Sequence, residues 1–389
     1  MPFKRYLEDV IAQDLEKKMV FLAGPRQVGK TTLAQGLLGR YKRGLYYLWD
    51  DPADRRELLR ARWPGEPAAV VLDELHKYRK WKTWIKGQYD KNRDRLRFLV
   101  TGSARLDVYR RGGDSLQGRY HHYRLHPLSV AELGGHRRSF VPFKELTFKE
   151  GDASEQLRSL MAYSGFPEPF TSQNEQEHRR WQKERLERFF REDVRDLENI
   201  RDLSSLQILA DLLPEKVGSL LSVNGIREDL EVSHKAAARW IEILSRLYHV
   251  FLIRPYTSKR IRGLKKEPKL YLWDWTLVPD PAARFENLIA SHLLKFCHYL
   301  EDTQGYRAEL HFLRDAAKRE VDFLVTVDRK PWFAVEAKLS ETGIAPPLAY
   351  FKERLSIPHV FQAVMNTEKD FIEKNIHLIP AGRFLTALV

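Results

Sequence analysis

Cysteine is nearly absent from this chain, since Cys297 is the only one among 389 residues. A single cysteine cannot form a disulfide within the chain or build a zinc site from cysteine ligands. Cys297 stands in an apolar stretch expected to be helical, where it fits as a small core residue. Because a chain without internal disulfides suits a reducing compartment, we expect a cytoplasmic protein.

Long apolar runs are also missing. No stretch of about 18 apolar residues marks a membrane span. The first residues, Met1 to Arg5, lead directly into charged helical sequence and do not have the pattern of a signal peptide. We therefore expect no membrane partner. With 43% hydrophobic and 31% charged residues, the chain should build ordinary cores, over two or three domains.

Acidic residues are unevenly distributed along the chain, whose net charge is +13. From His76 to Leu125 there are fourteen Lys or Arg against four Asp or Glu. From Pro281 to the end there are fourteen of each. A regional excess of positive charge predicts a face that binds a polyanion, and a solvated basic surface is the alternative.

The most specific motif is a phosphate-binding loop, two glycines five apart followed by Lys and a hydroxyl residue. With the next residue it comprises Gly24, Pro25, Arg26, Gln27, Val28, Gly29, Lys30, Thr31 and Thr32. An apolar strand is predicted before it and a helix after it. Backbone N–H groups should hold the phosphates of ATP, with Lys30 on the terminal phosphates and Thr31 on Mg²⁺. The alternative is a glycine-rich turn between strand and helix.

A second apolar run, Ala68–Leu72, ends in two acids. A run without alternation is typical of a central parallel strand. Asp73 is expected to hold Mg²⁺ directly or through water, and Glu74 to polarise the attacking water, unless the pair only caps the strand. A third strand ends near Thr101 and Ser103, which either orient that water or end the strand. These features predict a parallel α/β sheet with the nucleotide at its carboxyl edge.

The middle of the chain predicts the plan of a winged helix-turn-helix. Three helices are expected over Leu206–Leu213, Ile226–Leu230 and His234–Tyr248, followed by two strands. The segment from Arg254 to Lys269, which includes the wing, has seven Lys or Arg and one acid. Lys235 and Arg239 should face outward from the recognition helix. We expect DNA as the partner, and protein contacts are the alternative.

A group of charged residues near the C-terminus predicts a second site. Asp322 begins one strand, and Glu336 and Lys338, which end another, project on the same face because the strand period is two. Two carboxylates can bind Mg²⁺ or Mn²⁺ while a Lys positions water, as in restriction-endonuclease-like nucleases. Glu286, on the preceding helix, is a further candidate ligand. The alternatives are a surface ion pair and a nuclease fold whose chemistry is lost.

The whole chain resembles the prokaryotic AAA+-like ATPases that carry a C-terminal DUF4143 domain. Besides the motifs above, the resemblance is carried by Trp81, Gly118-Arg119, Pro127-Leu128-Ser129 and Phe285-Glu286-Asn287. It implies an ATPase domain of strand order 5-1-4-3-2 over 1–137, a linker and helical lid over 138–204, a winged helix-turn-helix over 205–280 and a nuclease-like α/β domain over 281–389.

The resemblance also implies a homo-oligomer, with a closed ring as one arrangement. An arginine that reaches across a subunit boundary usually completes such ATPase sites. Arg119 is the first candidate and Arg105 the second. Either could instead contact phosphate in its own subunit, or DNA.

Two functions remain open on the sequence alone. The leading one is a Mg²⁺-dependent ATPase that binds and acts on DNA, with a metal-dependent endonuclease as a further activity. The other is a nucleotide switch of the signalling or defence type, in which the nuclease-like domain is an inactive docking module. A metabolic kinase is disfavoured because no small-substrate domain is evident.

Overall fold

A computed structural model of the chain describes residues 3–102, 116–135, 139–148, 151, 153–194, 202–257, 266–341 and 343–389. Ser103 and Arg105 therefore lie outside the described residues. The chain divides into two compact units, Met1–Pro127 and Leu128–Val389, and each is described by itself. Within the described ranges, no helix is both long and apolar enough to cross a membrane.

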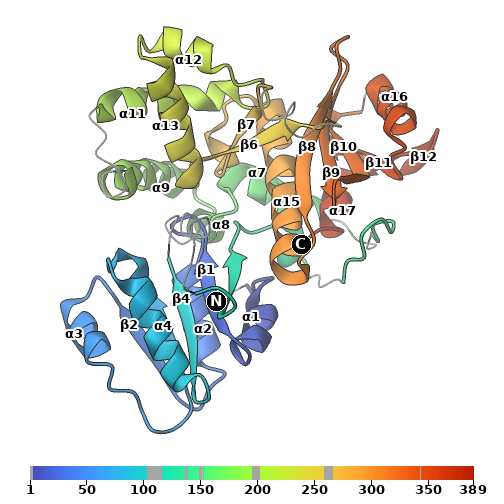
Figure 1. Ribbon diagram of the computed structural model, residues 1–389. Helices are drawn as coiled ribbons and strands as arrows, with labels where there is room; N and C mark the ends of the chain where they lie inside the picture. Colours follow the sequence, from blue (N-terminus) through green and yellow to red (C-terminus); the bar gives the residue numbers. More distant parts are fainter. Residues whose placement is uncertain are drawn as a thin grey trace. The chain divides into compact units, whose positions relative to one another are not determined.

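The first unit is built on a five-stranded parallel sheet of order β2-β3-β4-β1-β5, as the family resemblance implied (Figure 1). Its strands are β1 Met19–Ala23, β2 Gly44–Leu48, β3 Ala68–Asp73, β4 Leu96–Thr101 and β5 Tyr120–Arg124. Every residue of β1 and β3 is buried. Their continuous apolar runs form central strands because helices pack on the sheet and leave neither strand a solvated face.

The helices of this unit are α1 Glu8–Leu15, α2 Lys30–Leu38, α3 Pro52–Arg60, the short 3₁₀ turn η1 Leu75–Lys77 and α4 Trp81–Asn92. Trp81 and Ile85 of α4 pack into the core formed by β3, β4 and β1. The Asp51 side chain caps α3 by accepting from the N–H groups of Ala53 and Asp54. The carboxyl ends of β1 and β3 meet at one edge of the sheet, which positions the candidate site.

The second unit begins with a helical part. Its elements are α6 Val130–Leu133, α7 Ser154–Tyr163, α8 Pro167–Ser172, α9 Glu175–Arg188, the π-helical turn η3 Phe189–Val194, α11 Leu203–Leu212, η4 Leu213–Lys216, α12 Val223–Asp229 and α13 His234–Arg246. Ser222 caps α12 and Ser233 caps α13, each with its hydroxyl accepting a backbone N–H of the first turn. The three helices expected in this region are therefore present, as α11, α12 and α13.

An eight-stranded mixed sheet of order β12-β13-β11-β10-β9-β8-β6-β7 forms the rest of the second unit. Its elements are β6 Val250–Pro255, β7 Lys269–Leu272, η5 Trp275–Leu277, α15 Pro281–Gln304, β8 Ala308–Arg314, β9 Glu320–Val327, β10 Lys330–Ser340, α16 Pro346–Leu355, β11 His359–Asn366, β12 Phe371–Glu373, β13 Ile376–Pro380 and α17 Ala381–Thr386. β6 pairs with β8 through Arg254–His311 and Pro255–Phe312. The sheet therefore continues across the boundary that the sequence suggested near Pro281.

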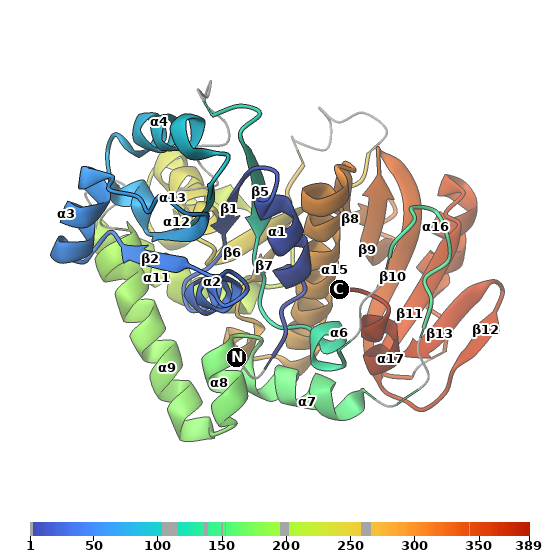
Figure 2. The ribbon, with the colours of Figure 1, turned by 90° about the horizontal axis from the view of Figure 1, so that it is seen from below.

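Three antiparallel strands beside the long helix α15 position the second cluster of charged residues. β8 pairs with β9 and β9 with β10, both antiparallel, whereas β11 joins β10 in parallel. The register of β9 and β10, with Phe323 opposite Val335, brings Asp322 next to Glu336. Figures 1 and 2 both show α15 running beside β8. Cys297 of α15 is buried, as expected for a small core residue.

Candidate functional site

The phosphate-binding loop leaves the carboxyl end of β1 in a conformation that only glycine tolerates at its first residue. Gly24 has φ +147°, and an added Cβ atom would lie 2.4 Å from the carbonyl oxygen of Leu125. The close approach is fixed by the hydrogen bond from Leu125 N–H to Ala23 O at 2.8 Å. Gly29, also at positive φ, is the N-cap of α2. The two glycines thus allow the turn that presents the N-terminus of α2 at the sheet edge.

Lys30 is the first residue of α2, and its side chain folds back over the loop. The buried ammonium donates to the carbonyl oxygens of Gly24 at 3.0 Å and Pro25 at 2.7 Å. The N–H groups of the first helical turn have no carbonyl partner within the helix and carry the positive end of its dipole. A helix N-terminus together with a loop lysine is an anion site suited to phosphate.

Asp73, the last residue of β3, has its carboxylate held by three hydroxyl groups. Thr31 Oγ1 donates to Oδ2 at 2.7 Å and Tyr46 OH donates to the same oxygen at 2.8 Å. Thr101 Oγ1 donates to Oδ1, from the β4 position that pairs with Asp73. The predicted neighbours Thr31, Asp73 and Thr101 are therefore in contact, and Tyr46 was missed because tyrosine in a half-buried strand gives no signal in the sequence.

Glu74 follows β3 with the left-handed backbone angle φ +58°, a conformation that is strained for a side chain other than glycine. Its N–H donates to Thr101 O at 3.1 Å. The carboxylate oxygen Oε2 is 3.6 Å from both His76 Nε2 and Lys77 Nζ. Within the described part of the chain this buried oxygen makes no hydrogen bond. Burial raises the pKa of Glu74 above its usual range, as suits a group that accepts a proton from water.

Arg119 lies at the opposite end of the sheet from the loop. It precedes β5 and its backbone carbonyl pairs with Met19 N–H at the start of β1. Its guanidinium forms a two-pronged pair with Asp90 of α4, with Nε–Oδ1 at 2.8 Å and Nη2–Oδ2 at 3.1 Å. The pair lowers the pKa of Asp90. This placement puts Arg119 at the edge of the sheet away from the phosphate-binding loop of its own subunit. Its role across a subunit boundary, or in contact with DNA, stays a prediction.

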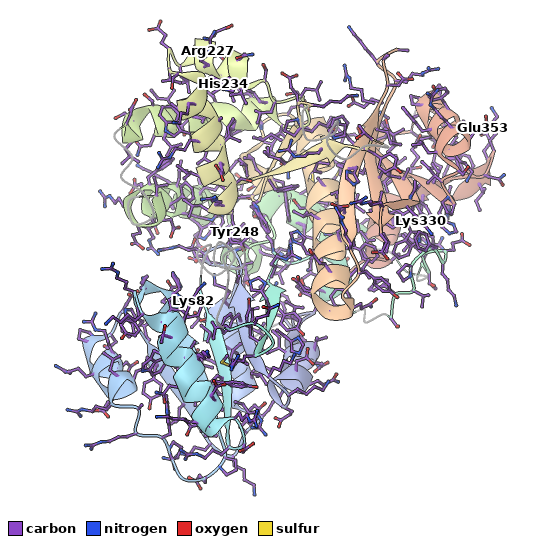
Figure 3. All side chains as sticks on the ribbon, viewed as in Figure 1. Lys82, Arg227, His234, Tyr248, Lys330 and Glu353 are labelled. Carbon is purple, nitrogen blue, oxygen red and sulfur yellow. The ribbon has the colours of Figure 1, made fainter. Side chains whose placement is uncertain are left out.

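The outward face of α13 carries the cations that the sequence predicted there. Lys235, Arg239, Glu242 and Arg246 are exposed and spaced so that they share one side of the helix, and Glu242 pairs with Arg246 at 2.7 Å. The opposite side packs Trp240, Ile241 and Leu244 into the core. Figure 3 labels His234, at the start of α13, and Arg227 of α12, the helix that contacts α13. The charged tip of the expected wing, 258–265, lies outside the described residues.

The second cluster brings the predicted Asp322, Glu336 and Lys338 together. Asp322 Oδ2 accepts the N–H of Ala337 at 3.0 Å, and Glu336 Oε2 accepts the N–H of Asp322 at 3.3 Å. Lys338 Nζ lies 2.7 Å from Glu336 Oε1. Glu286, from α15, comes close enough that the Asp322 charge acts on it. The structure thus brings these four side chains together.

A fifth charged residue, which the sequence had assigned to the basic wing, enters the same cluster. Lys269 of β7 has only 3% of its side chain exposed, and its ammonium lies 3.2 Å from Glu286 Oε1, 2.7 Å from Glu320 Oε1 and 3.7 Å from Asp322 Oδ1. Tyr271 OH donates to Glu286 Oε1 at 2.7 Å. The assignment of Lys269 to an exposed DNA-binding segment is wrong, because its side chain is buried against carboxylates.

The pKa values in this cluster follow from burial and crowding of charge. Burial, and then the neighbouring Asp322 carboxylate, raise the pKa of Glu286 and of Glu336 to about 7. Burial alone would lower the pKa of Lys269, but the surrounding carboxylates raise it above its usual value. Among the described residues, no group of three or more His, Cys, Asp or Glu side chains is arranged to hold a metal ion. The expected second metal site therefore has no support in the geometry.

Three family models match consecutive parts of the chain. An AAA domain matches residues 16–134, and DUF4143, a domain of unknown function, matches residues 282–384. The chain is an AAA-domain protein with a C-terminal DUF4143 domain. The resemblance inferred from the motifs is thus confirmed. A further domain of unknown function, DUF8612, matches residues 154–282 between them and was not anticipated from the sequence.

Similar proteins add no assigned role. The uncharacterized protein Rv2008c of Mycobacterium tuberculosis is 23% identical over 262 residues, which cover 67% of this chain and 55% of that protein. This chain thus spans little more than half the length of that relative. The uncharacterized protein MJ1544 of Methanocaldococcus jannaschii is 22% identical over 358 residues, covering 86% of this chain and 79% of that protein.

Among solved structures, the Walker-type ATPase PABY2304 of Pyrococcus abyssi matches with a TM-score of 0.44 and 15% sequence identity, over 72% of this chain and 95% of that one. The AAA domain itself has the parallel sheet and the phosphate-binding loop of P-loop nucleoside triphosphate hydrolases. Hydrolysis of nucleoside triphosphates is the general activity that this fold supports.

Proposed function

We propose that the AAA domain is a Mg²⁺-dependent ATP hydrolase. The observation that carries the proposal is the contact between Thr31 Oγ1 and Asp73 Oδ2 at 2.7 Å, beside a carboxylate, Glu74, with a buried oxygen that accepts no hydrogen bond from the described residues. Hydroxyl and carboxylate oxygens are the ligands that Mg²⁺ prefers, so the residues present fit the ion. Thr31 and Asp73 are the groups that would hold it.

Each residue of the loop has a defined task in this reaction. The N–H groups at the start of α2 and the Lys30 ammonium bind the phosphates, and Lys30 exchanges the carbonyl oxygens of Gly24 and Pro25 for phosphate oxygens. Bound Mg²⁺ supplies positive charge against the developing charge on the phosphates. Glu74 orients the attacking water and takes its proton, and Thr101 keeps Asp73 in place.

We further propose that DNA is the partner that this hydrolysis serves. Support comes from the exposed cations Lys235 and Arg239 on α13, and from the two strands β6 and β7 that follow the helix as in a winged helix. Lys266, shortly before β7, is a further exposed cation of this region. Lys and Arg on one helix face bind the phosphate backbone through charge, without reading sequence.

Phosphate release from ATP, measured with the full chain, tests both parts. We expect turnover that requires Mg²⁺ and stops with chelator, and a several-fold increase in rate on adding single-stranded, duplex or branched DNA. Absence of turnover with Mg²⁺ and every DNA would refute the ATPase assignment. Turnover that ignores every DNA, together with no binding at about 50 mM salt, would reject DNA as the partner.

A second candidate is a nucleotide switch in which the DUF4143 domain binds a partner without cleaving it. The buried Lys269 ammonium among the carboxylates favours this interpretation of the domain, and it speaks against the endonuclease activity considered from the sequence. Slow hydrolysis that is insensitive to DNA is the result expected of a switch. The same turnover assay therefore separates the two candidates.

A further inference from the structure

The carboxylate cluster of the DUF4143 domain, defined as Glu286, Glu320, Asp322 and Glu336, contains a cation supplied by the chain. The Lys269 ammonium is within 3.2 Å of oxygens from two of these residues and 3.7 Å from a third. Carboxylates held together repel, so a cation among them is required for the cluster to fold in its ionised form. The sequence suggested that a divalent ion meets this need, whereas the structure meets it with an ammonium group.

Most oxygens of the cluster already accept from donors of the protein. Asp322 Oδ2 accepts the N–H of Ala337, Glu336 Oε2 accepts the N–H of Asp322, and Glu336 Oε1 faces Lys338. Glu320 Oε2 accepts a hydrogen bond from the Arg314 guanidinium. Mg²⁺ requires near-octahedral oxygen ligands at about 2.0–2.1 Å. To bind Mg²⁺, these carboxylates would have to give up their ion pairs with Lys269 and Lys338, and the buried Lys269 ammonium would then lie beside the metal.

Lys269 is held in place on both sides of its strand. Its neighbour Leu270 accepts the N–H of Gly218 at 3.1 Å, and Ile253 of β6 pairs with Lys269 itself. Further along β7, Leu272 exchanges two hydrogen bonds of 2.8 Å with the Asn287 side chain. These contacts fix the backbone of β7, and the Lys269 side chain that it carries is buried, with 3% exposed.

Glu286 is covered at the same time by the backbone of Gly218. This glycine has φ +74°, and an added Cβ atom would lie 3.1 Å from Glu286 Oε2 and 3.2 Å from Oε1. Tyr271 OH and Lys269 Nζ contact the same carboxylate, at 2.7 and 3.2 Å from Oε1. The Glu286 carboxylate, expected to be a further metal ligand, is therefore already in contact with groups of the chain, although 20% of its side chain is exposed.

We propose that the Lys269 ammonium is the resident cation of the carboxylate cluster, and that the DUF4143 domain therefore keeps a closed, metal-free acidic centre. A divalent ion added next to Lys269 would place like charges within a few ångströms in a poorly hydrated site, which is unfavourable. Removing the ammonium while the four carboxylates stay in place converts the cluster into a divalent-ion site. The inference does not depend on ATP hydrolysis.

Mn²⁺ binding to the full chain, followed by electron paramagnetic resonance without nucleotide, tests the proposal. All variants carry Asp73→Asn, which removes the metal ligand of the AAA domain. In this background we expect the same Mn²⁺ stoichiometry with and without Asp322→Asn. Lys269→Met should gain one bound Mn²⁺ with at least tenfold higher affinity, and the added Asp322→Asn change should abolish the gain. Lys269→Arg keeps the positive charge and should gain none.

Two results would overturn the proposal. One is Mn²⁺ binding by the chain with Lys269 intact that disappears with Asp322→Asn. The other is a folded Lys269→Met variant that gains no Mn²⁺, since Lys269 would then not be what excludes the ion. If Lys269→Met does not fold, the test is the Mn²⁺ binding of the Asp73→Asn chain with and without Asp322→Asn, both with Lys269 intact. Binding that is lost with Asp322→Asn refutes the closed centre. Equal binding by the two proteins supports it.

Discussion

At the scale of single residues, three hydroxyl groups hold the carboxylate of Asp73, which we propose as a metal ligand of the AAA domain. Tyr46 contributes one of them from β2, with its OH 2.8 Å from Asp73 Oδ2. Burial, together with the hydrogen bond to Asp73, raises the pKa of Tyr46, so the phenol stays protonated and remains a donor. Groups that orient a metal ligand in this way typically change metal affinity by about 10- to 100-fold when removed.

We therefore predict that Tyr46→Phe raises the Mg²⁺ concentration for half-maximal ATP turnover by about tenfold, equivalent to about 1.4 kcal/mol. The ring packing is retained and only the donor is removed. Tyr47→Phe is the matched control, because the Tyr47 ring packs against Trp63 at 6.1 Å and no hydrogen bond joins it to Asp73 among the described residues. Identical Mg²⁺ titrations for Tyr46→Phe and the unchanged chain would remove Tyr46 from this role.

A buried histidine of α15 gives the second unit a defined response to acid. His292 Nε2 accepts the N–H of Val130 at 3.2 Å while Nδ1 lies 2.8 Å from Leu288 O. The ring is thus neutral with its proton on Nδ1, because a nitrogen that accepts cannot carry a proton. Burial lowers the pKa of His292 to about 3, and the nearby Lys295 and Glu132 charges act in opposite directions on it.

The sign of the pH effect follows from the unfolded chain, in which the ring titrates near about 6.5. Between that pH and about 3 the unfolded chain binds one more proton, so the free energy of unfolding falls by about 1.4 kcal/mol per pH unit on acidification. We predict that His292→Gln removes about one proton from the pH dependence measured by urea unfolding. His234→Gln, at an exposed position of α13, is the control and should leave the slope unchanged. An unaltered slope in His292→Gln would contradict the assignment.

At the scale of elements, motifs made of residues close together in the sequence could be predicted. Burial that results from the pairing of segments distant in the sequence could not. The sequence predicted the loop from Gly24 to Thr31 and the acids Asp73 and Glu74 at the end of β3, because these motifs are defined by the spacing of residues along the chain. Lys269 has the sequence context of a wing residue and is buried only because β7 pairs with β6 and lies against α15. Pairing of segments distant in sequence decides its role, and one sequence does not contain that pairing.

The outward face of α13 allows the DNA proposal to be tested as a property of one helix. Reversing Lys235 and Arg239 to Glu should weaken DNA binding and reduce the magnitude of the slope of log K against log salt, by about 0.9 for each phosphate that the helix no longer neutralises. The paired change Lys330→Glu with Lys374→Glu alters charge equally at exposed positions. Figure 3 shows Lys330 far from His234 within the same unit. Equal slopes for the two double variants would reject α13 as the element that binds DNA.

At the scale of the whole molecule, the position of Arg119 makes assembly part of the catalytic proposal. Its guanidinium, paired with Asp90, is at the end of the sheet opposite the phosphate-binding loop of its own subunit. From this edge of the sheet, the role expected of Arg119 in hydrolysis is at the site of a neighbouring subunit. We therefore propose a homo-oligomer, with a closed ring as the arrangement that completes every site.

Mixing inactive variants tests this proposal. Arg119→Ala supplies an intact loop and Lys30→Ala supplies an intact arginine, so mixed oligomers contain interfaces with both. We predict that each variant alone is nearly inactive and that the mixture recovers a measurable fraction of ATP turnover. Asp90→Asn, which removes the negative charge paired with Arg119 but keeps the arginine, should remain active. If assembly is confirmed and mixing restores nothing, Arg119 does not act across a subunit boundary.

The most direct test of ATP hydrolysis by the AAA domain is a comparison of ATP binding and turnover in Lys30→Ala and Glu74→Gln. We predict that Lys30→Ala loses tight binding, because the ammonium that meets the phosphates is gone. Glu74→Gln should bind ATP as the unchanged chain does and turn it over about 10²- to 10⁴-fold more slowly, the usual contribution of a general base. Hydrolysis by Glu74→Gln at the rate of the unchanged chain would contradict the role of Glu74 as the base that activates water.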